Sequence, residues 1–244
     1  GGNAITVDVI ETEGTLDNLS MTLDKNECDA MIGQPDGPVY LSRTSTGATK
    51  RLRQIASLHR EYLHVLCNKA SGIDDLSDLN GKNGSLAIGE PGSGGWLIWQ
   101  NLVQEDDSYA NVPVTNESGI LALSAVSSGD SAVCMLVPAG LGNGTIREAD
   151  MTFGDTVVLA DANDKDFNDA TDINGKPLYQ YVDIPSGTYN LNLQTGFFGS
   201  AVTTISWNAG VYINTDSFQD KKKLQSFTTA VSRAAVGIKA EFGQ

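Results

Sequence analysis

The stretch Ser71–Trp99, SGIDDLSDLNGKNGSLAIGEPGSGGWLIW, decides the fold assignment. Its Asp- and Ser-rich start predicts a short helix, and the Gly81-Lys82-Asn83-Gly84 turn separates that helix from a buried strand over Ser85–Ile88. The glycine-rich loop Gly89–Gly95 follows, and a second helix is expected to open at Trp96. A strand that runs through a tight turn into a helix is the repeating unit of α/β proteins.

The loop Gly89–Gly95 and the first amides of the helix after it form a candidate anion seat. The first amides of a helix lack partners within the helix and lie at the positive end of its dipole. Glycines allow a ligand to approach the backbone, and the Ser93 hydroxyl adds another hydrogen-bonding group. The sequence therefore predicts a bound carboxylate at Gly92, Ser93 and Gly94.

Other interpretations of the loop were weighed. A phosphate-binding P-loop needs Lys and Ser/Thr after its last glycine, but Gly95 and Trp96 stand there. A nucleophile elbow needs Gly-x-Ser-x-Gly, which Gly92-Ser93-Gly94 does not provide. Both are rejected. A simple helix cap by Ser93 remains open, because spacing alone does not separate a cap from an anion seat.

The composition is that of a folded, acidic protein. Thirty acidic and 16 basic residues give a net charge of −14, so the surface should repel nucleic acid and anionic lipid. No apolar run is long enough to span a membrane, so no direct membrane insertion is expected. No signal segment is recognisable at the N-terminus, which fits either a cytosolic protein or numbering that starts after processing.

The three cysteines, Cys28, Cys67 and Cys134, lie in or beside apolar runs and form no CxxC pair. Buried free thiols are the expected state, and one disulfide bond is left open.

The rest of the chain alternates strand and helix signals. Strands are expected at 5–10, 28–32, 55–58, 62–67, 112–114, 131–137, 201–205 and 209–213, and helices after Gly14, at 96–104, at 118–127 and at 217–240. Strand, helix and strand joined by short connections build a parallel sheet, and ligands bind outside the carboxyl ends of such strands. Gln34, Asp36 and Tyr40 lie at one such end, although Pro, Asp and Gly are also ordinary turn residues.

The carboxylate-rich segment Asp155–Asp172 predicts a solvated acidic helix. A calcium-binding loop starting at Asp161 would need Asp or Asn at its fifth position and Gly at its sixth, where Lys165 and Asp166 stand. No metal site and no cofactor are predicted.

Three segments, LRQIASLHREYLHVLCNKASGIDDLSDLNGKNGSLAIGEPGSG at 52–94, AVSSGDSAVCMLVPAG at 125–140 and IPSGTY at 184–189, resemble the TAXI family of solute receptors. The resemblance implies an α/β type II periplasmic-binding-protein fold with two lobes, residues 1–62 with 206–244 and residues 63–205. It also implies a small carboxylate such as glutamate clamped between the lobes, a periplasmic location, and delivery to a TRAP-type membrane transporter. Gln34, Asp36, Tyr40, Gly92, Ser93 and Gly94 are then the expected ligand contacts.

The chain departs from the family in three respects. Gly1-Gly2-Asn3 leads directly into what resembles the family's second strand, so the first strand-helix unit has no counterpart, and we hypothesise that a central strand is missing or donated. Gly95 and Trp96 replace the hydroxyl residue that usually follows Ser-Gly, and His59 stands where a Tyr is usual.

Catalysis is not expected. His59 and His64 are the only histidines, they have no metal-ligand spacing, and no nucleophile lies beside a base in the sequence. The alternative to a transport receptor is a sensor or partner-binding module that uses the same two-lobed fold.

Overall fold

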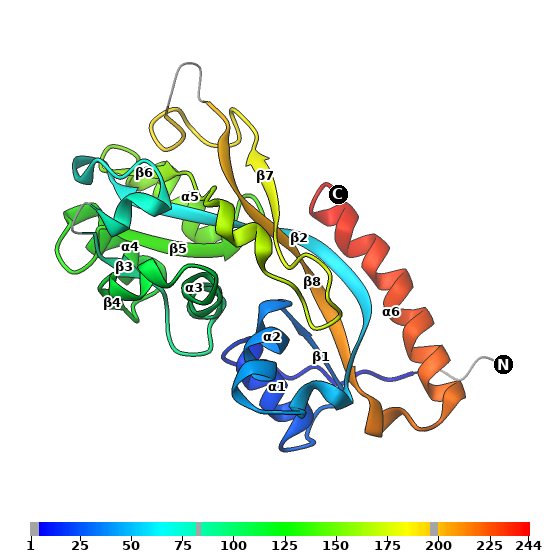
Figure 1. The fold of residues 1–244 in the computed structure, drawn as a ribbon. Coiled ribbons are helices and arrows are strands. Elements are labelled where there is room, and N and C mark those ends of the chain that lie inside the picture. Colours follow the sequence, from blue (N-terminus) through cyan, green and yellow to red (C-terminus); the bar gives the residue numbers. More distant parts are fainter. Residues whose placement is uncertain (1–4, 82–83, 196–199) are drawn as a thin grey trace. The chain divides into compact units, whose positions relative to one another are not determined.

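A computed structural model describes residues 5–81, 84–195 and 200–244. The Gly1-Gly2-Asn3 start and two residues of the Gly81–Gly84 turn lie outside the described residues. The chain divides into two compact units: unit 1 contains residues 1–60, 172–174 and 208–244, and unit 2 contains residues 61–171 and 175–207. The strands β2 (Leu52–Asn68) and β8 (Val202–Asn214) run from one unit into the other (Figure 1).

Unit 1 is built on the antiparallel pair of β1 and the C-terminal half of β8, in which Met31 lies opposite Tyr212. Leu19, Leu23, Met31, Leu52 and Tyr212 form one apolar cluster, and residues of β2, β8 and the long C-terminal helix form another. The other elements of unit 1 are α1 (Thr15–Leu23), β1 (Ala30–Gly33), α2 (Asp36–Thr44), the 3-10 helices Ala48–Arg51 and Thr215–Phe218, and α6 (Lys221–Glu241).

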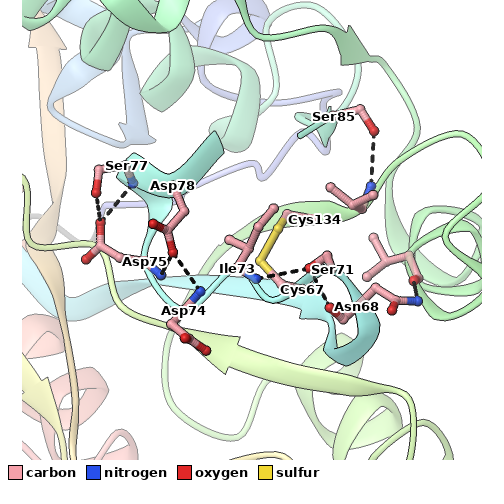
Figure 2. Close-up of a disulfide and its surroundings, with 12 residues drawn as sticks. Cys67, Asn68, Ser71, Ile73, Asp74, Asp75, Ser77, Asp78, Ser85 and Cys134 are labelled. Carbon is pink, nitrogen blue, oxygen red and sulfur yellow. Dashed lines mark hydrogen bonds between the residues drawn. A yellow bond between two sulfur atoms is a disulfide. The ribbon is translucent and has the colours of Figure 1, made fainter. Parts of the chain in front are cut away.

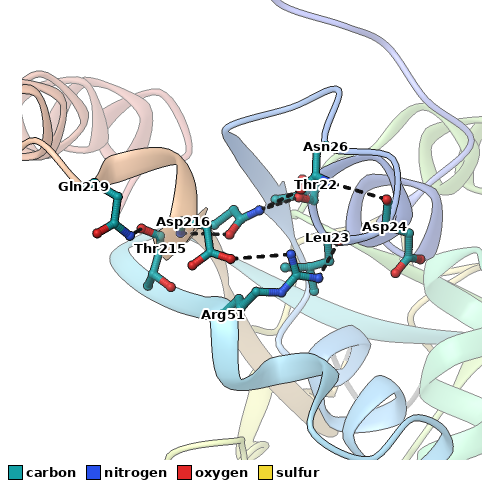
Figure 3. Close-up of polar contacts among 9 residues, drawn as sticks. Thr22, Leu23, Asp24, Asn26, Arg51, Thr215, Asp216 and Gln219 are labelled. Carbon is teal, nitrogen blue, oxygen red and sulfur yellow. Dashed lines mark hydrogen bonds and ion pairs between the residues drawn. The ribbon is translucent and has the colours of Figure 1, made fainter.

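The Arg51 side chain joins three segments of unit 1 (Figure 3). It donates a hydrogen bond of 2.6 Å to the carbonyl oxygen of Leu23 at the end of α1, and its guanidinium lies 3.7 Å from an Asp216 carboxylate oxygen. Arg51 therefore satisfies a carbonyl that α1 leaves without a helical partner.

The expected strand over Ile5–Ile10 is wrong. The backbone there forms no strand, and its apolar side chains are exposed, Val9 by 84%. Alternation predicts a strand only where a partner strand exists, because an extended backbone needs hydrogen bonds from a neighbour.

The outward edge of β1 is partly occupied by side chains of α1. Asn214 N–H donates to Asp29 O, so the odd-numbered residues of β1 bond to β8 and the even-numbered ones face away. On that outer edge, the Asn18 side chain donates to Ile32 O at 2.9 Å, and the Thr15 hydroxyl accepts from Gln34 N–H at 3.2 Å. The hypothesis of a missing or donated strand stays a prediction.

Unit 2 carries the elements of the stretch from Ser71 to Trp99. Its strands are β3 (Leu86–Ala87), β4 (Val114–Thr115), β5 (Cys134–Ala139), β6 (Val157–Ala160) and β7 (Gln180–Ile184), together with parts of β2 and β8. Its α-helices are α3 (Gly94–Glu105), α4 (Gly119–Ser128) and α5 (Gly144–Thr152), and its 3-10 helices are Lys69–Ser71, Leu76–Asn80, Asp107–Asn111 and Lys165–Asp169.

The sheet of unit 2 places β3 between two parallel neighbours. Leu86 lies opposite Cys134 of β5 on one side and Val114 of β4 on the other. On its other side, β5 pairs antiparallel with β2, which also pairs with β6, while β7 pairs with β8. The predicted α/β class is thus confirmed.

Several predicted elements need correction. The runs 55–58 and 62–67 are one strand, β2, and the runs 201–205 and 209–213 are one strand, β8, because the residues between the runs keep a paired, extended backbone. The segment Asp155–Asp172 is not an acidic helix: its beginning forms β6, and Lys165–Asp169 is a 3-10 helix capped by Asp164. The helices α2 and α5 were not predicted.

The short helix expected after Ser71 is confirmed as the 3-10 helix Leu76–Asn80. Asp75 and Asp78 form a capping box: Asp75 accepts from Ser77 N–H at 2.8 Å, and Asp78 accepts from Asp75 N–H at 3.3 Å. The Asp-rich start of the stretch is thus a helix N-terminus (Figure 2).

The expectation of free thiols is wrong for two of the three cysteines. Cys67 of β2 and Cys134 of β5 lie directly opposite each other, with Cα atoms 4.0 Å apart, and form a fully buried disulfide (Figure 2). Cys28 is a free, partly exposed thiol. The sequence could not pair the cysteines because their register depends on β2 and β5 being neighbours.

The disulfide should contribute measurably to stability, because it closes a loop with a sequence separation of 67. We predict that the double substitution Cys67→Ala/Cys134→Ala lowers the free energy of unfolding by about 4 kcal/mol. Denaturant unfolding measures this value, and Cys28→Ala is the matched control, expected to change it by less than about 0.5 kcal/mol. Equal unfolding midpoints for the double variant and the parent chain would contradict the prediction.

Candidate functional site

Three helices of unit 2 begin at the same edge of the sheet. The parallel strands β3, β4 and β5 are followed directly in the chain by α3, α4 and α5. Their N-terminal amides are therefore gathered beyond the carboxyl ends of these strands, where ligands of open α/β sheets bind.

The loops that open α3 and α4 are joined to each other by hydrogen bonds. Gly89 N–H donates to Glu117 O at 3.1 Å, and the Asn116 side chain donates to Gly89 O at 2.9 Å. These bonds continue the pairing of β3 with β4, in which Ile88 N–H donates to Thr115 O at 3.0 Å, and they fix the two helix starts relative to each other.

Ser93 caps α3 and lies close to the start of α4. Its hydroxyl oxygen accepts from Trp96 N–H at 3.4 Å, which is a long contact. A side chain built on Gly89, which has a φ of +88°, would lie 2.6 Å from the Ser93 hydroxyl oxygen and 4.0 Å from Ser118 Cβ. Gly89 thus lies between Ser93 and Ser118, the residues that precede α3 and α4.

Ser118 was missed as a site candidate, although Ser118-Gly119 before an apolar helix repeats the pattern of Ser93-Gly94. Ser118 is exposed, and its side chain makes no capping hydrogen bond to α4. The sequence contains this pattern, but it does not show that β3 and β4 pair in parallel. That pairing is what brings the two loops together.

Helix α3 begins at Gly94, two residues earlier than predicted, because Gly95 lies against the sheet. A Cβ at Gly95 would lie 2.6 Å from Ile88 O and 3.5 Å from Leu136 O. The close approach of the helix to both strands accounts for the small residue that follows Ser93-Gly94 in this chain.

We predict that Gly95→Ala lowers the free energy of unfolding by on the order of 1–3 kcal/mol, because the added methyl group displaces α3 from the carbonyl of Ile88. Gly237→Ala is the control, since nothing lies within 4 Å of a Cβ at that position in α6. It should raise stability by about 0.5–1 kcal/mol. Thermal unfolding measures the stability of both variants. An unchanged stability of Gly95→Ala would contradict the close packing.

The three candidates in unit 1 lie at the start of α2 and not in a turn. Gln34 follows β1, whereas Asp36 and Tyr40 belong to the helix. Asp36 is fully buried, and Tyr40 and Gln34 are partly buried. Burial raises the pKa of the nearby Tyr212 phenol, and the charge of Asp36 raises it further. The ligand role of Gln34, Asp36 and Tyr40 stays a prediction, as does that of Gly92, Ser93 and Gly94.

A buried histidine lies next to the start of α5, and the sequence analysis assigned it no role. His64 of β2 is fully buried, with Nδ1 at 3.2 Å from Val137 O and Nε2 at 2.8 Å from the Tyr189 hydroxyl. Burial lowers the pKa of His64 from 6.5 to about 4, against the opposing effect of backbone hydrogen bonds. His64 is therefore neutral at pH 7.

The neutral state of His64 predicts acid sensitivity. Between pH 6.5 and about 4 the unfolded chain binds a proton that the folded chain does not, so stability falls as the pH is lowered through this range. The loss amounts to about 3 kcal/mol at full protonation of the unfolded histidine.

Unfolding free energies of the parent chain and His64→Gln, measured from pH 7 to 4, isolate this effect. The difference in unfolding free energy between the parent chain and His64→Gln should narrow as the pH falls, because glutamine does not titrate. A constant difference across the range would show that His64 does not carry the acid sensitivity.

One acidic group within the described residues has a geometry that a cation could use. Ligand oxygens of Asp106, Asp164 and Asp166 all lie within 4.8 Å of one another. Two of these carboxylates already act as caps: Asp106 accepts from Ser108 N–H at 2.9 Å, and Asp164 accepts from Asp166 N–H at 3.0 Å.

Among the helices that the structure describes, none is long and apolar enough to cross a membrane.

Comparison with solved structures defines the class of protein. The ligand-binding core of GluR0 from Nostoc punctiforme in complex with L-glutamate matches with a TM-score of 0.50, 11% identity, and coverage of 98% of this chain and 81% of that one. The effector-binding domain of QuiR in complex with shikimate matches with a TM-score of 0.50, 11% identity, and coverage of 92% and 79%. A protein of Bordetella bronchiseptica RB50 matches with a TM-score of 0.51 and 16% identity. The fold is that of the type II periplasmic binding proteins.

The sequence profile of the NMT1-like family matches residues 2–221. The chain belongs to the NMT1-like family. No curated protein matches the sequence significantly. The fold is thus that of a solute-binding-protein-like domain.

Proposed function

We propose that this chain is a TAXI-type solute receptor that binds a small carboxylate, glutamate or a related acid, and delivers it to a TRAP-type membrane transporter. The anion seat at Gly89–Gly95 holds the carboxylate. The observation that supports this role is the joining of the starts of α3 and α4 through Gly89, Asn116 and Glu117, which directs the amides of two helices to one loop pair.

The charges of the two loops favour a zwitterion over a simple anion. Glu90 and Glu117 are exposed residues of the same loops, and they would repel a ligand that carries only negative charge. An α-amino acid satisfies both kinds of group, since its carboxylate accepts from backbone amides and its ammonium is attracted by carboxylates. Glutamate is therefore expected to bind more tightly than glutarate.

A periplasmic location fits this role. Disulfides persist in oxidising compartments and are rare in the cytosol, and Cys67–Cys134 is such a bond. The proposed partners are accordingly a small carboxylate-bearing ligand and the transporter, with no role for nucleic acid.

Calorimetric titration with L-glutamate, glutarate, shikimate and sulfate tests the proposal. Binding of glutamate at about micromolar affinity without turnover supports the receptor. No heat with any of the four ligands would reject carboxylate capture and favour the sensor or partner-binding alternative, and conversion of a ligand would favour an enzyme.

Substitutions of Ser93 distinguish an anion seat from a plain helix cap. Asp is as good an N-cap as Ser, so Ser93→Asp should keep the stability of the parent chain, but its charge should lower glutamate affinity at least about tenfold. Ser93→Ala should weaken binding by on the order of 1–3 kcal/mol.

Asp220→Ala is the matched control, because it removes the cap of α6, where Asp220 accepts from Lys222 N–H at 2.8 Å. It should cost stability without changing affinity. Unchanged glutamate binding by Ser93→Asp would leave Ser93 as a cap only.

A further inference from the structure

Three hydrogen bonds connect the buried His64 to the loop before α5. A carbonyl oxygen only accepts, so the 3.2 Å contact of His64 Nδ1 with Val137 O places the ring proton on Nδ1. His64 Nε2 then accepts from the Tyr189 hydroxyl at 2.8 Å, and the phenol oxygen accepts from Gly142 N–H at 3.3 Å. Every donor in this chain of bonds has an acceptor.

The backbone of Tyr189 is held on its other side by Gln194, which is fully buried. Tyr189 N–H donates to Gln194 Oε1 at 3.2 Å, and Gln194 Nε2 donates to the carbonyl oxygens of Pro185 at 3.0 Å and Ser200 at 3.0 Å. The segment Ile184–Tyr189 therefore has a fixed position, and the phenol ring projects from it toward His64 (ring centroids 5.8 Å apart).

The partner of the phenol is the loop Gly140–Asn143, which connects β5 to α5. Gly142 has a φ of +76°, a conformation that side chains disfavour, and Asn143 caps α5 by accepting from Thr145 N–H at 2.9 Å. A Cβ at Gly142 would lie 3.2 Å from the Arg147 guanidinium, so a cation lies over this loop. The loop follows β5, which is the parallel neighbour of β3.

We propose that Tyr189 is a positioning residue that fixes the Gly140–Asn143 loop for ligand binding only while His64 is neutral. The inference rests on the proposed function, because the loop lies beyond the carboxyl end of a strand in the same parallel set as β3. It assigns a role to the Ile184–Tyr189 motif and to His64 that neither the fold nor the family supplies.

Protonation of His64 breaks the chain of bonds. Nε2 then carries a proton and donates to the phenol oxygen, which already accepts from Gly142 N–H, and the phenol proton loses its acceptor. The groups around the two rings do not compensate: the Tyr62 ring on β2 lies 6.5 Å from the His64 ring between centroids, Arg147 on α5 is a cation, and Asp150 on α5 already accepts from Asn190 N–H at 2.9 Å. The Nε2 proton then competes with Gly142 N–H for the phenol oxygen, which weakens the bond that holds the loop.

Hydrogen exchange of the Gly142 amide, measured by NMR on the ligand-free chain, tests the structural part. Tyr189→Phe should speed exchange at Gly142 by about fivefold to tenfold, relative to the intrinsic rate, because its acceptor is removed. Tyr181→Phe is the matched control: it removes the phenol that donates to Asp164 O elsewhere in unit 2 and should leave Gly142 unchanged.

Lowering the pH through about 4 should reduce the protection of Gly142 in the parent chain and not in His64→Gln, since glutamine keeps an acceptor for the phenol and does not titrate. Equal protection of Gly142 in the parent chain and Tyr189→Phe, or the same pH profile with and without His64, would overturn the inference.

Glutamate titrations complete the test. Tyr189→Phe should weaken binding about tenfold at neutral pH, whereas Tyr181→Phe should not. If Gly142 responds as expected but Tyr189→Phe binds glutamate as the parent chain does, the positioning role is rejected. If the parent chain binds no ligand, the proposed function fails, while the exchange data still decide whether His64 and Tyr189 hold the loop.

Discussion

The contact between α3 and the sheet at Gly95 is the constraint on which the site in unit 2 depends, because any side chain there would meet the backbone carbonyl oxygen of Ile88 at 2.6 Å. This contact sets where α3 begins, and the start of α3 sets where its free amides point. Because Gly89 is bonded to the loop of β4, the start of α4 is fixed by the same arrangement. A single steric requirement thus organises the backbone donors on which the proposed binding role depends.

The Ser71–Trp99 stretch was predictable because its signals are local. The capping box of Asp75 and Asp78, the short buried strand and the Ser93 cap each involve residues only a few positions apart. The alternation of strands and helices predicts the α/β class, and the comparisons confirm that class.

The errors arise where a distant partner decides the outcome. Ile5–Ile10 has the alternation of a strand, but it pairs with no strand among the residues that the structure describes. Cys67 and Cys134 pair because β2 and β5 lie in register, which no spacing along the sequence reveals. His64 and Tyr189 are 125 positions apart, and the sequence gives no sign of their contact. Asp36, expected at a loop, is buried at the start of an unpredicted helix.

The proposed binding role joins several parts of unit 2. In that proposal, amides from helix starts attract a carboxylate, and exposed Glu90 and Glu117 restrict the ligand class. The buried disulfide joins β5 to β2. The neutral His64 with Tyr189 supports the remaining helix start. Membership of the NMT1-like family and the fold agree with solute binding, and the ligand and the transporter are to be identified by experiment.

The most direct measurement is a titration of the isotope-labelled chain with L-glutamate, followed by amide chemical shifts. The account predicts that the largest shifts occur at the amides of Gly94, Gly95 and Trp96 and of Gly119 and Ile120, the starts of α3 and α4. Saturable binding that leaves these amides unshifted, with the changes confined to other parts of the chain, would contradict it.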